Sequence, residues 1–158
     1  MTLTTRRAIL NDFERIKIYW QKVVDEDPTA MMRITCDQLP HRTFCGDIYT
    51  QALGNTLPLD SDLQAWLGDH NRWRIYTAED EGQILGTLMA DWTDGRVSWV
   101  HATLNKWLDM LLPLVQCQYA DTGTVPWSNV LLAEVAEVLD QVPEFYPDWD
   151  GNYYLRVD

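Results

Sequence analysis

The stretch from residue 72 to residue 102 restricts the fold of this chain more than any other part. Its three segments alternate between apolar and polar residues and cover 72–78, 83–92 and 96–102. Alternation with a period of two is typical of β-strands. The two turns between the segments contain Gly82 and Gly95, and glycine allows the positive φ that tight hairpins often need. The sequence therefore predicts a three-stranded antiparallel meander.

Helical patterns precede the meander. A short strand is expected over residues 3–8, followed by a helix that runs to about Val24. Asn11 is the predicted cap of this helix, with Glu14 three residues further on, as in a capping box. A second helix is predicted over about 43–53, and Ser61 is expected to cap a short helix that ends at Gly68.

The chain returns to a helical pattern after the meander. Asn105 is the expected cap of a helix whose apolar stripe runs to Tyr119, and Pro113 should kink that helix. Residues 128–142 are predicted mainly as helix, although 130–135 are also compatible with a buried strand. A final strand is expected over 152–158. The predicted fold class is mixed α/β (α+β): a largely antiparallel central sheet flanked by helices, forming one domain over 1–158.

The net charge of −12 limits the possible partners. Nucleic acid, membrane headgroups and other acidic polymers would be repelled. Residues 101–158 contain two basic and nine acidic side chains, which is a net charge of −7. This acidic part is either a solvated face or the contact surface for a basic partner. No apolar run is long enough to span a bilayer, and an intracellular protein is expected.

Two segments resemble GCN5-related N-acetyltransferases (GNAT). Residues 3–16 are similar to the opening strand and helix of that family. Residues 75–88 are similar to its central hairpin, with acidic residues and glycine in the turn and Leu85-Gly86 early in the second strand. The resemblance implies a GNAT-like fold, and with it acetyl-CoA as a cofactor, held by a basic, glycine-rich segment between the fourth strand and the next helix.

In this chain the corresponding segment departs from the family pattern. It falls at residues 101–109, contains no glycine, and has Lys106 as its only lysine or arginine. A Cβ atom at each position hinders close approach of the backbone to phosphate. The chain therefore resembles a degenerate member that has lost acetyl-CoA binding and has no cofactor. Degenerate domains of this kind occur in tailed bacteriophages, including as virion components.

Candidate site residues follow from the alternative that acetyl-CoA does bind. Lys106 would then contact the cofactor, His101 could act as a general base, and Tyr146 lies near the position of the family's thiolate-protonating tyrosine. The competing interpretation of His101 is an imidazole packed at a sheet edge, on one face with Val97 and Trp99. Glu134 or Glu137 could also act as a base, but carboxylates on the outer face of a helix are usually solvated.

A second group of candidates lies in the acidic, aromatic segment 144–150. Trp149 and Tyr146, with Asp148 and Asp150, could anchor a protein interface. The alternative is that this segment covers a sheet edge. No metal site is expected, since Cys36, His41 and Cys45 lack a nearby fourth ligand and are better explained as two buried thiols and a surface histidine.

Three functions remain in order of preference. The first is a GNAT-like protein without acetyl-CoA that acts through contacts with a basic protein, in a virion or in the host cytoplasm. The second is an active N-acetyltransferase with an atypical cofactor loop. The third is an acidic inhibitor that mimics nucleic acid, although many of its carboxylates are scattered singly.

Overall fold

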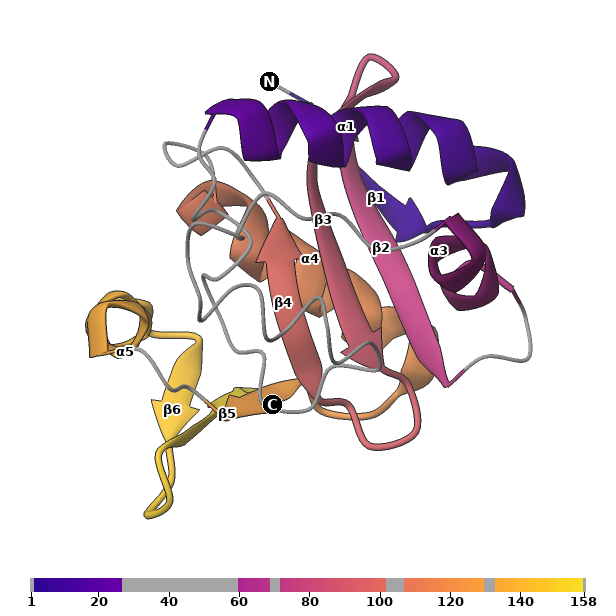
Figure 1. Ribbon diagram of the computed structural model, residues 1–158. Coiled ribbons are helices and arrows are strands. Elements are labelled where there is room, and N and C mark those ends of the chain that lie inside the picture. The colour runs from indigo at the N-terminus through magenta and orange to yellow at the C-terminus, as the bar shows by residue number, and fades with distance from the viewer. Residues whose placement is uncertain (1, 27–59, 69–71, 102–106, 130–132, 158) are drawn as a thin grey trace.

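The computed structural model describes residues 2–26, 60–68, 72–101, 107–129 and 133–157 (Figure 1). In chain order the strands are β1 (Thr4–Arg7), β2 (Trp73–Asp80), β3 (Gln83–Asp91), β4 (Val97–His101), β5 (Trp127–Asn129), β6 (Phe145–Pro147) and β7 (Asn152–Leu155). The helices are the 3-10 turn η1 (Leu10–Asp12), α1 (Phe13–Glu26), α3 (Asp60–Trp66), α4 (Trp107–Thr122) and α5 (Ala133–Asp140). The predicted helix over 43–53 and the Cys36–His41–Cys45 cluster lie outside the described residues.

The strands form two antiparallel sheets. The larger has the order β1-β2-β3-β4, so the predicted meander is confirmed. The smaller has the order β5-β7-β6. One apolar cluster joins α1 and α3 to one face of the larger sheet, and a second joins α4 to the other face (Figure 1). The fold is therefore an α+β arrangement with a largely antiparallel sheet between helices, as the sequence predicts.

The start of α1 differs from the prediction. Asn11 does not cap the helix, because it lies inside the η1 turn. Asp12 instead accepts a hydrogen bond from the backbone N–H of Ile9 at 2.8 Å and so closes the turn before Phe13. Ser61 likewise lies within the first turn of its helix, which begins at Asp60. Neither Asn11 nor Ser61 therefore occupies the capping position that the sequence predicts.

Strand β4 contains an extra residue. Val97 lies opposite Ala90, whereas Trp99 lies opposite Met89, so Ser98 has no partner position on β3. Such a bulge bends a strand and increases its twist. Because of the bulge, Val97 and Trp99 lie opposite Ala90 and Met89, which are neighbours on β3 and therefore face opposite sides of the sheet. The prediction that Val97 shares one face with Trp99 and His101 is therefore wrong for Val97.

The C-terminal part forms the smaller sheet and α5. The helix predicted over 128–142 is confirmed for Ala133–Asp140, but it is preceded by the short strand Trp127–Asn129. The last strand begins at Asn152, as predicted, and ends at Leu155. Strand β6 (Phe145–Pro147) was not predicted, since three residues are too few for a periodic pattern.

Candidate functional site

Strands β4 and β5 meet at one point and then separate. The backbone N–H of Trp127 donates to the carbonyl oxygen of Gly95 at 3.1 Å, and Arg96 forms an isolated parallel bridge with Trp127. Ser128 Oγ adds a hydrogen bond to the carbonyl oxygen of Val97 at 3.2 Å. Beyond this point β5 pairs with β7, and no described strand pairs with the outer edge of β4 (Figure 1). Val97 of β4 and Ser128 of β5, next to this point, line an opening between the two sheets.

Gly95 allows β4 and β5 to approach each other closely at this point. Its φ is +83°, and a Cβ atom added there would lie 2.4 Å from the carbonyl oxygen of Val125. The Gly95 carbonyl oxygen accepts from Trp127 and also from Gln118 Nε2, at 2.9 Å. Only glycine fits, because the position needs both a left-handed backbone and close approach of another chain segment.

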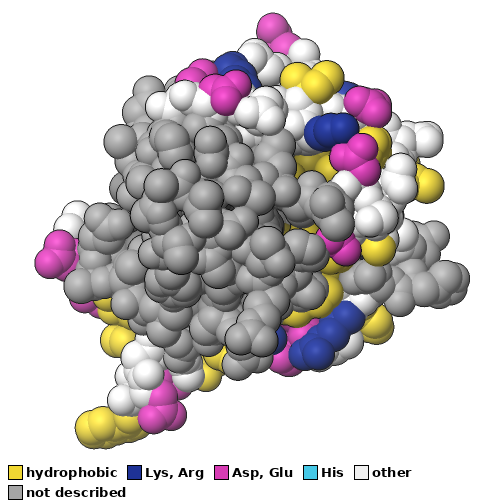
Figure 2. Space-filling model, viewed as in Figure 1, with side chains coloured by type: hydrophobic (Ala, Val, Ile, Leu, Met, Phe, Trp, Pro, Cys, Tyr) yellow, Lys and Arg dark blue, Asp and Glu magenta, His cyan; other side chains and the backbone are white. Residues whose placement is uncertain are grey.

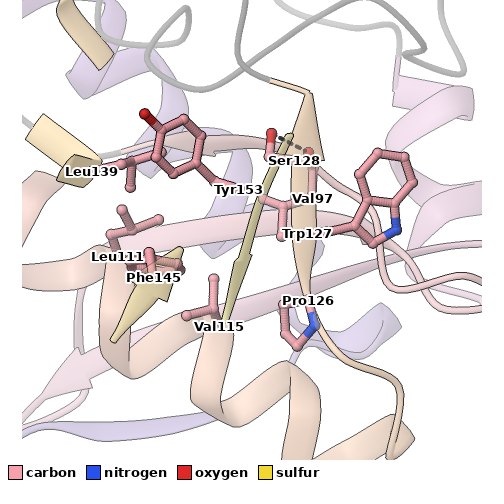
Figure 3. Close-up of a pocket in the computed structure, with 9 residues that line it drawn as sticks. All are labelled: Val97, Leu111, Val115, Pro126, Trp127, Ser128, Leu139, Phe145 and Tyr153. Carbon is pink, nitrogen blue, oxygen red and sulfur yellow. Dashed lines mark hydrogen bonds between the residues drawn. The ribbon is translucent and has the colours of Figure 1, made fainter. Parts of the chain in front are cut away.

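Apolar side chains fill the α4 side of the opening and leave a cavity of about 20 Å³. The cavity is lined by Val97, Leu111, Val115, Pro126, Trp127, Ser128, Leu139, Phe145 and Tyr153 (Figure 3). The indole of Trp127 points away from the other lining side chains, which turn toward one another. A cavity of this size has room for about one water molecule. The space is an extension of the core.

The hydroxyl groups of Ser128 and Tyr153, which line the cavity, already form hydrogen bonds. The Ser128 hydroxyl donates to Val97, as described above, and Tyr153 Oη lies 2.6 Å from Asp140 Oδ1. Burial, together with the hydrogen bond to Asp140, raises the pKa of Tyr153 to about 12. Its hydroxyl therefore stays protonated at neutral pH and gives the cavity no acid–base group that is ready to react.

Of the predicted catalytic side chains, those of Tyr146 and Glu137 are described, and neither lines this cavity. His101 ends β4 with its backbone opposite Thr87, but the side chain of His101 and all of Lys106 lie outside the described residues. Tyr146 lies in β6 next to Phe145, and neighbouring strand residues face opposite sides. Phe145 lines the cavity, so Tyr146 is on the outer face of the small sheet. Glu137 is exposed on α5, and the side chain of Glu134 lies outside the described residues.

The outer face of the small sheet carries a row of aromatic rings. Trp127, Tyr154 and Tyr146 lie side by side on β5, β7 and β6. The ring centroids are 6.0 Å apart for Trp127 and Tyr154, and 5.6 Å apart for Tyr154 and Tyr146, both in stacked geometry. The guanidinium of Arg156 lies 5.2 Å from the Tyr146 ring centroid. Cross-strand aromatic contacts of this kind stabilise a small sheet.

The tip of the β6–β7 hairpin presents Trp149 to solvent. Trp149 has a relative exposure of 102%, and Asp150 beside it is exposed too. Asp148 builds the turn: its carboxylate accepts from the backbone N–H groups of Asp150 at 2.8 Å and Asn152 at 3.0 Å. Gly151 supplies a φ of +81°. Figure 2 shows an apolar side chain protruding beside a carboxylate at this tip. The turn that carries the exposed Trp149 side chain is therefore held in place by hydrogen bonds to Asp148.

A buried charge cluster, not predicted from the sequence, lies beside α1. Asp12 and Glu79 are nearly buried, and Arg6 forms ion pairs with both carboxylates, at 2.7 and 2.9 Å. Arg15 forms ion pairs with the same two carboxylates. Hydrogen bonding to Arg6 lowers the pKa of Asp12 to about 2. The cluster ties β1, α1 and β2 together. Because every carboxylate in it is paired, its role is structural.

The described part of the chain contains neither a metal-binding cluster nor a membrane-spanning helix. No group of three or more His, Cys, Asp or Glu side chains there could hold a metal ion. None of the described helices combines the length and the apolarity that crossing a bilayer requires.

Known proteins share the fold of this chain. No family model and no curated protein sequence matches it. The GNAT domain of S. lividans PAT aligns with a TM-score of 0.59 at 15% identity, covering 98% of this chain and 89% of that one. An N-acetyltransferase from Staphylococcus aureus Mu50 gives 0.55 at 7% identity, covering 98% and 95%. A possible acetyltransferase from Clostridium difficile 630 gives 0.53 at 12% identity, covering 94% of each chain. The predicted GNAT-like fold is confirmed.

Proposed function

We propose that this GNAT-fold chain acts by binding another protein and not by transferring acetyl groups. The observation that carries the proposal is the space beside Val97 of β4 and Ser128 of β5, where the described apolar side chains leave about 20 Å³. Pockets that bury small ligands have volumes of roughly 300–1,000 Å³. The thioester arm of acetyl-CoA would have to displace the core side chains Leu111 and Val115, and Phe145 packed against them, to enter on this side.

The charge of the chain supports the same proposal. Residues 101–158 have a net charge of −7, and the segment 101–109 contains no glycine. A phosphate site uses backbone N–H groups and positive charge at a helix N-terminus. Residues with side chains hinder that approach, and the net negative charge of residues 101–158 opposes binding of the cofactor's phosphates.

The β6–β7 hairpin is the proposed contact surface. Trp149 is fully exposed, and the hydrogen bonds of Asp148 hold the turn before any partner binds. An aromatic anchor that is ordered in advance loses little conformational entropy on binding. The exposed carboxylate of Asp150 favours a partner surface that offers a lysine or arginine side chain. The resemblance to phage-encoded domains suggests that the contact is made in a virion or in the host cytoplasm.

Isothermal titration with acetyl-CoA tests the loss of cofactor binding. We expect no heat of binding up to millimolar acetyl-CoA, with an active acetyltransferase titrated in parallel as the positive control. Binding with a micromolar Kd would overturn the proposal, because that affinity requires about 8 kcal/mol of favourable free energy from a site with room for phosphates and the thioester arm.

The alternative is an N-acetyltransferase with an atypical cofactor loop. One observation favours it: the outer edge of β4 beyond Val97 has no strand partner among the described residues. Such an edge offers N–H and C=O groups to an extended ligand that contains amides. Acetyl transfer to a panel of amines, abolished in His101→Ala, would support this alternative. No turnover, together with no acetyl-CoA binding, would remove it.

A further inference from the structure

We propose that the chain associates with itself head to tail, with Trp149 and Asp150 of one copy docked against α1 of the next. This inference rests on the proposed function, because it names the protein that the hairpin binds. The acceptor is a groove between α1 and the turn from β2 to β3. It is lined by Arg15, Ile18, Tyr19, Lys22, Gly82, Gln83 and Ile84.

The groove has the size and lining for an aromatic side chain. Its volume is about 240 Å³. Tyr19 and Ile84 form a floor that belongs to the core, and Ile18 is 67% exposed at the rim. Covering an exposed isoleucine and the apolar floor beside it with another apolar side chain is favourable, because it removes apolar surface from water. The indole of Trp149, which is fully exposed, supplies such a cover.

The charges at the two surfaces are complementary. Lys22 is exposed on α1, and its ammonium has no partner among the described residues. Arg15 reaches across the groove and donates to the carbonyl oxygen of Gly82 at 2.7 Å. Asp150 is exposed beside Trp149, and no described side chain pairs with its carboxylate. With Trp149 in the groove, Asp150 would approach Lys22, which would remove an unpaired charge from each copy.

The positions of the two surfaces determine the kind of assembly. The β6–β7 hairpin and the β2–β3 turn lie at opposite ends of the molecule (Figure 1). One chain therefore cannot fill its own groove. Because the donor and acceptor surfaces differ, the contact is heterologous, and it produces a ring or an open filament. The area of one side chain and its neighbours is small, so association should be weak and should grow with concentration.

Sedimentation velocity and light scattering over a range of concentrations test the proposal. We expect the mean mass of the wild type to exceed that of a monomer at about 100 µM and to fall on dilution. Trp149→Ala removes the anchor, and Ile18→Glu places a carboxylate at the groove. Each should weaken association by at least tenfold. Leu10→Glu, at another exposed apolar position, is the matched control and should associate like the wild type.

Mixing the two defective variants gives the sharper result. Trp149→Ala keeps an intact groove and Ile18→Glu keeps an intact hairpin, so an equimolar mixture should form a dimer and no larger species. Asp150→Lys should also weaken association, and combining it with Lys22→Glu should restore it.

Several results would overturn the inference. A wild type that stays monomeric at all concentrations would do so, as would a mixture that forms no dimer. Loss of association in Trp149→Ala but not in Ile18→Glu would assign the hairpin to a different surface. Capture of neutral lipid vesicles by the wild type alone, without self-association, would assign Trp149 to a membrane. The acetyl-CoA titration is independent of these outcomes, so failure of the head-to-tail contact and failure of the proposed function remain distinguishable.

Discussion

Replacing Asp12 with asparagine should destabilise the fold by about 2 kcal/mol at neutral pH. The Asp12 side chain accepts from Arg6 at 2.7 and 2.9 Å, from Arg15 at 3.1 Å and from the Ile9 N–H at 2.8 Å. Hydrogen bonding to Arg6 is the largest cause that lowers its pKa from 3.8 to about 2. That difference corresponds to about 2.4 kcal/mol. The two arginine side chains are 38% and 41% exposed, so water recovers part of the loss.

The pH dependence of this effect follows from its sign. A carboxyl group with a lowered folded-state pKa stabilises the fold above its unfolded pKa, and this contribution is lost as the pH falls from about 3.8 to about 2. Asparagine does not titrate. The difference in unfolding free energy between wild type and Asp12→Asn should therefore be constant from pH 7 to pH 5 and should shrink toward pH 2.

Urea denaturation followed by far-UV circular dichroism at each pH measures this difference. Glu14→Gln, an exposed acid two residues along the chain, is the control and should change stability by less than about 0.5 kcal/mol. The reasoning would be refuted if Asp12→Asn matched that control at pH 7. It would also be refuted if its destabilisation were undiminished at pH 2.

The remaining predictions concern the β4–β5 meeting point, the cavity and the hairpin. Gly95→Ala should destabilise the fold by at least about 3 kcal/mol in denaturant unfolding. The added Cβ would clash with the carbonyl oxygen of Val125, and alanine would be strained at a φ of +83°. Wild-type stability of this variant would contradict the prediction. Leu111→Ala should cost about 2–5 kcal/mol by enlarging the cavity, whereas Leu111→Met should cost less than about 1.5, and equal effects would count against a packed core there. Asp148→Ala should accelerate amide hydrogen exchange at Asp150 and Asn152 without lowering the Tm, and unchanged exchange would show that the turn holds without the carboxylate.

Local patterns accounted for most of the larger sheet. The alternation over 72–102 and the glycines of its turns predicted strands β2 to β4, and Gly82 and Gly95 do have positive φ. These features depend on residues close together in the chain. The pattern could not locate the bulge at Ser98, because a bulge is defined by the register of pairing with the neighbouring strand, which the sequence of one strand does not contain.

The candidate site was predictable only in part. The sequence singled out the segment with Trp149, and the structure places that residue at an exposed hairpin tip. The sequence also suggested Asp148 as a contact residue. In the structure, the carboxylate of Asp148 accepts hydrogen bonds within the turn. The α1 groove gave no signal, since its lining comes from α1 and from a turn that is about 60 residues away in sequence.

By itself, then, the sequence determined the meander, most of the flanking helices and the acidity of the C-terminal part. All three follow from composition or from periodicities of a few residues. Only the tertiary structure decided which side chains fill the opening beside β4, and which carboxylates Arg6 neutralises, one of them 73 residues away. Those outcomes depend on packing between distant segments, where one side chain of the right volume or charge determines whether a space is a cavity, a core or a binding site.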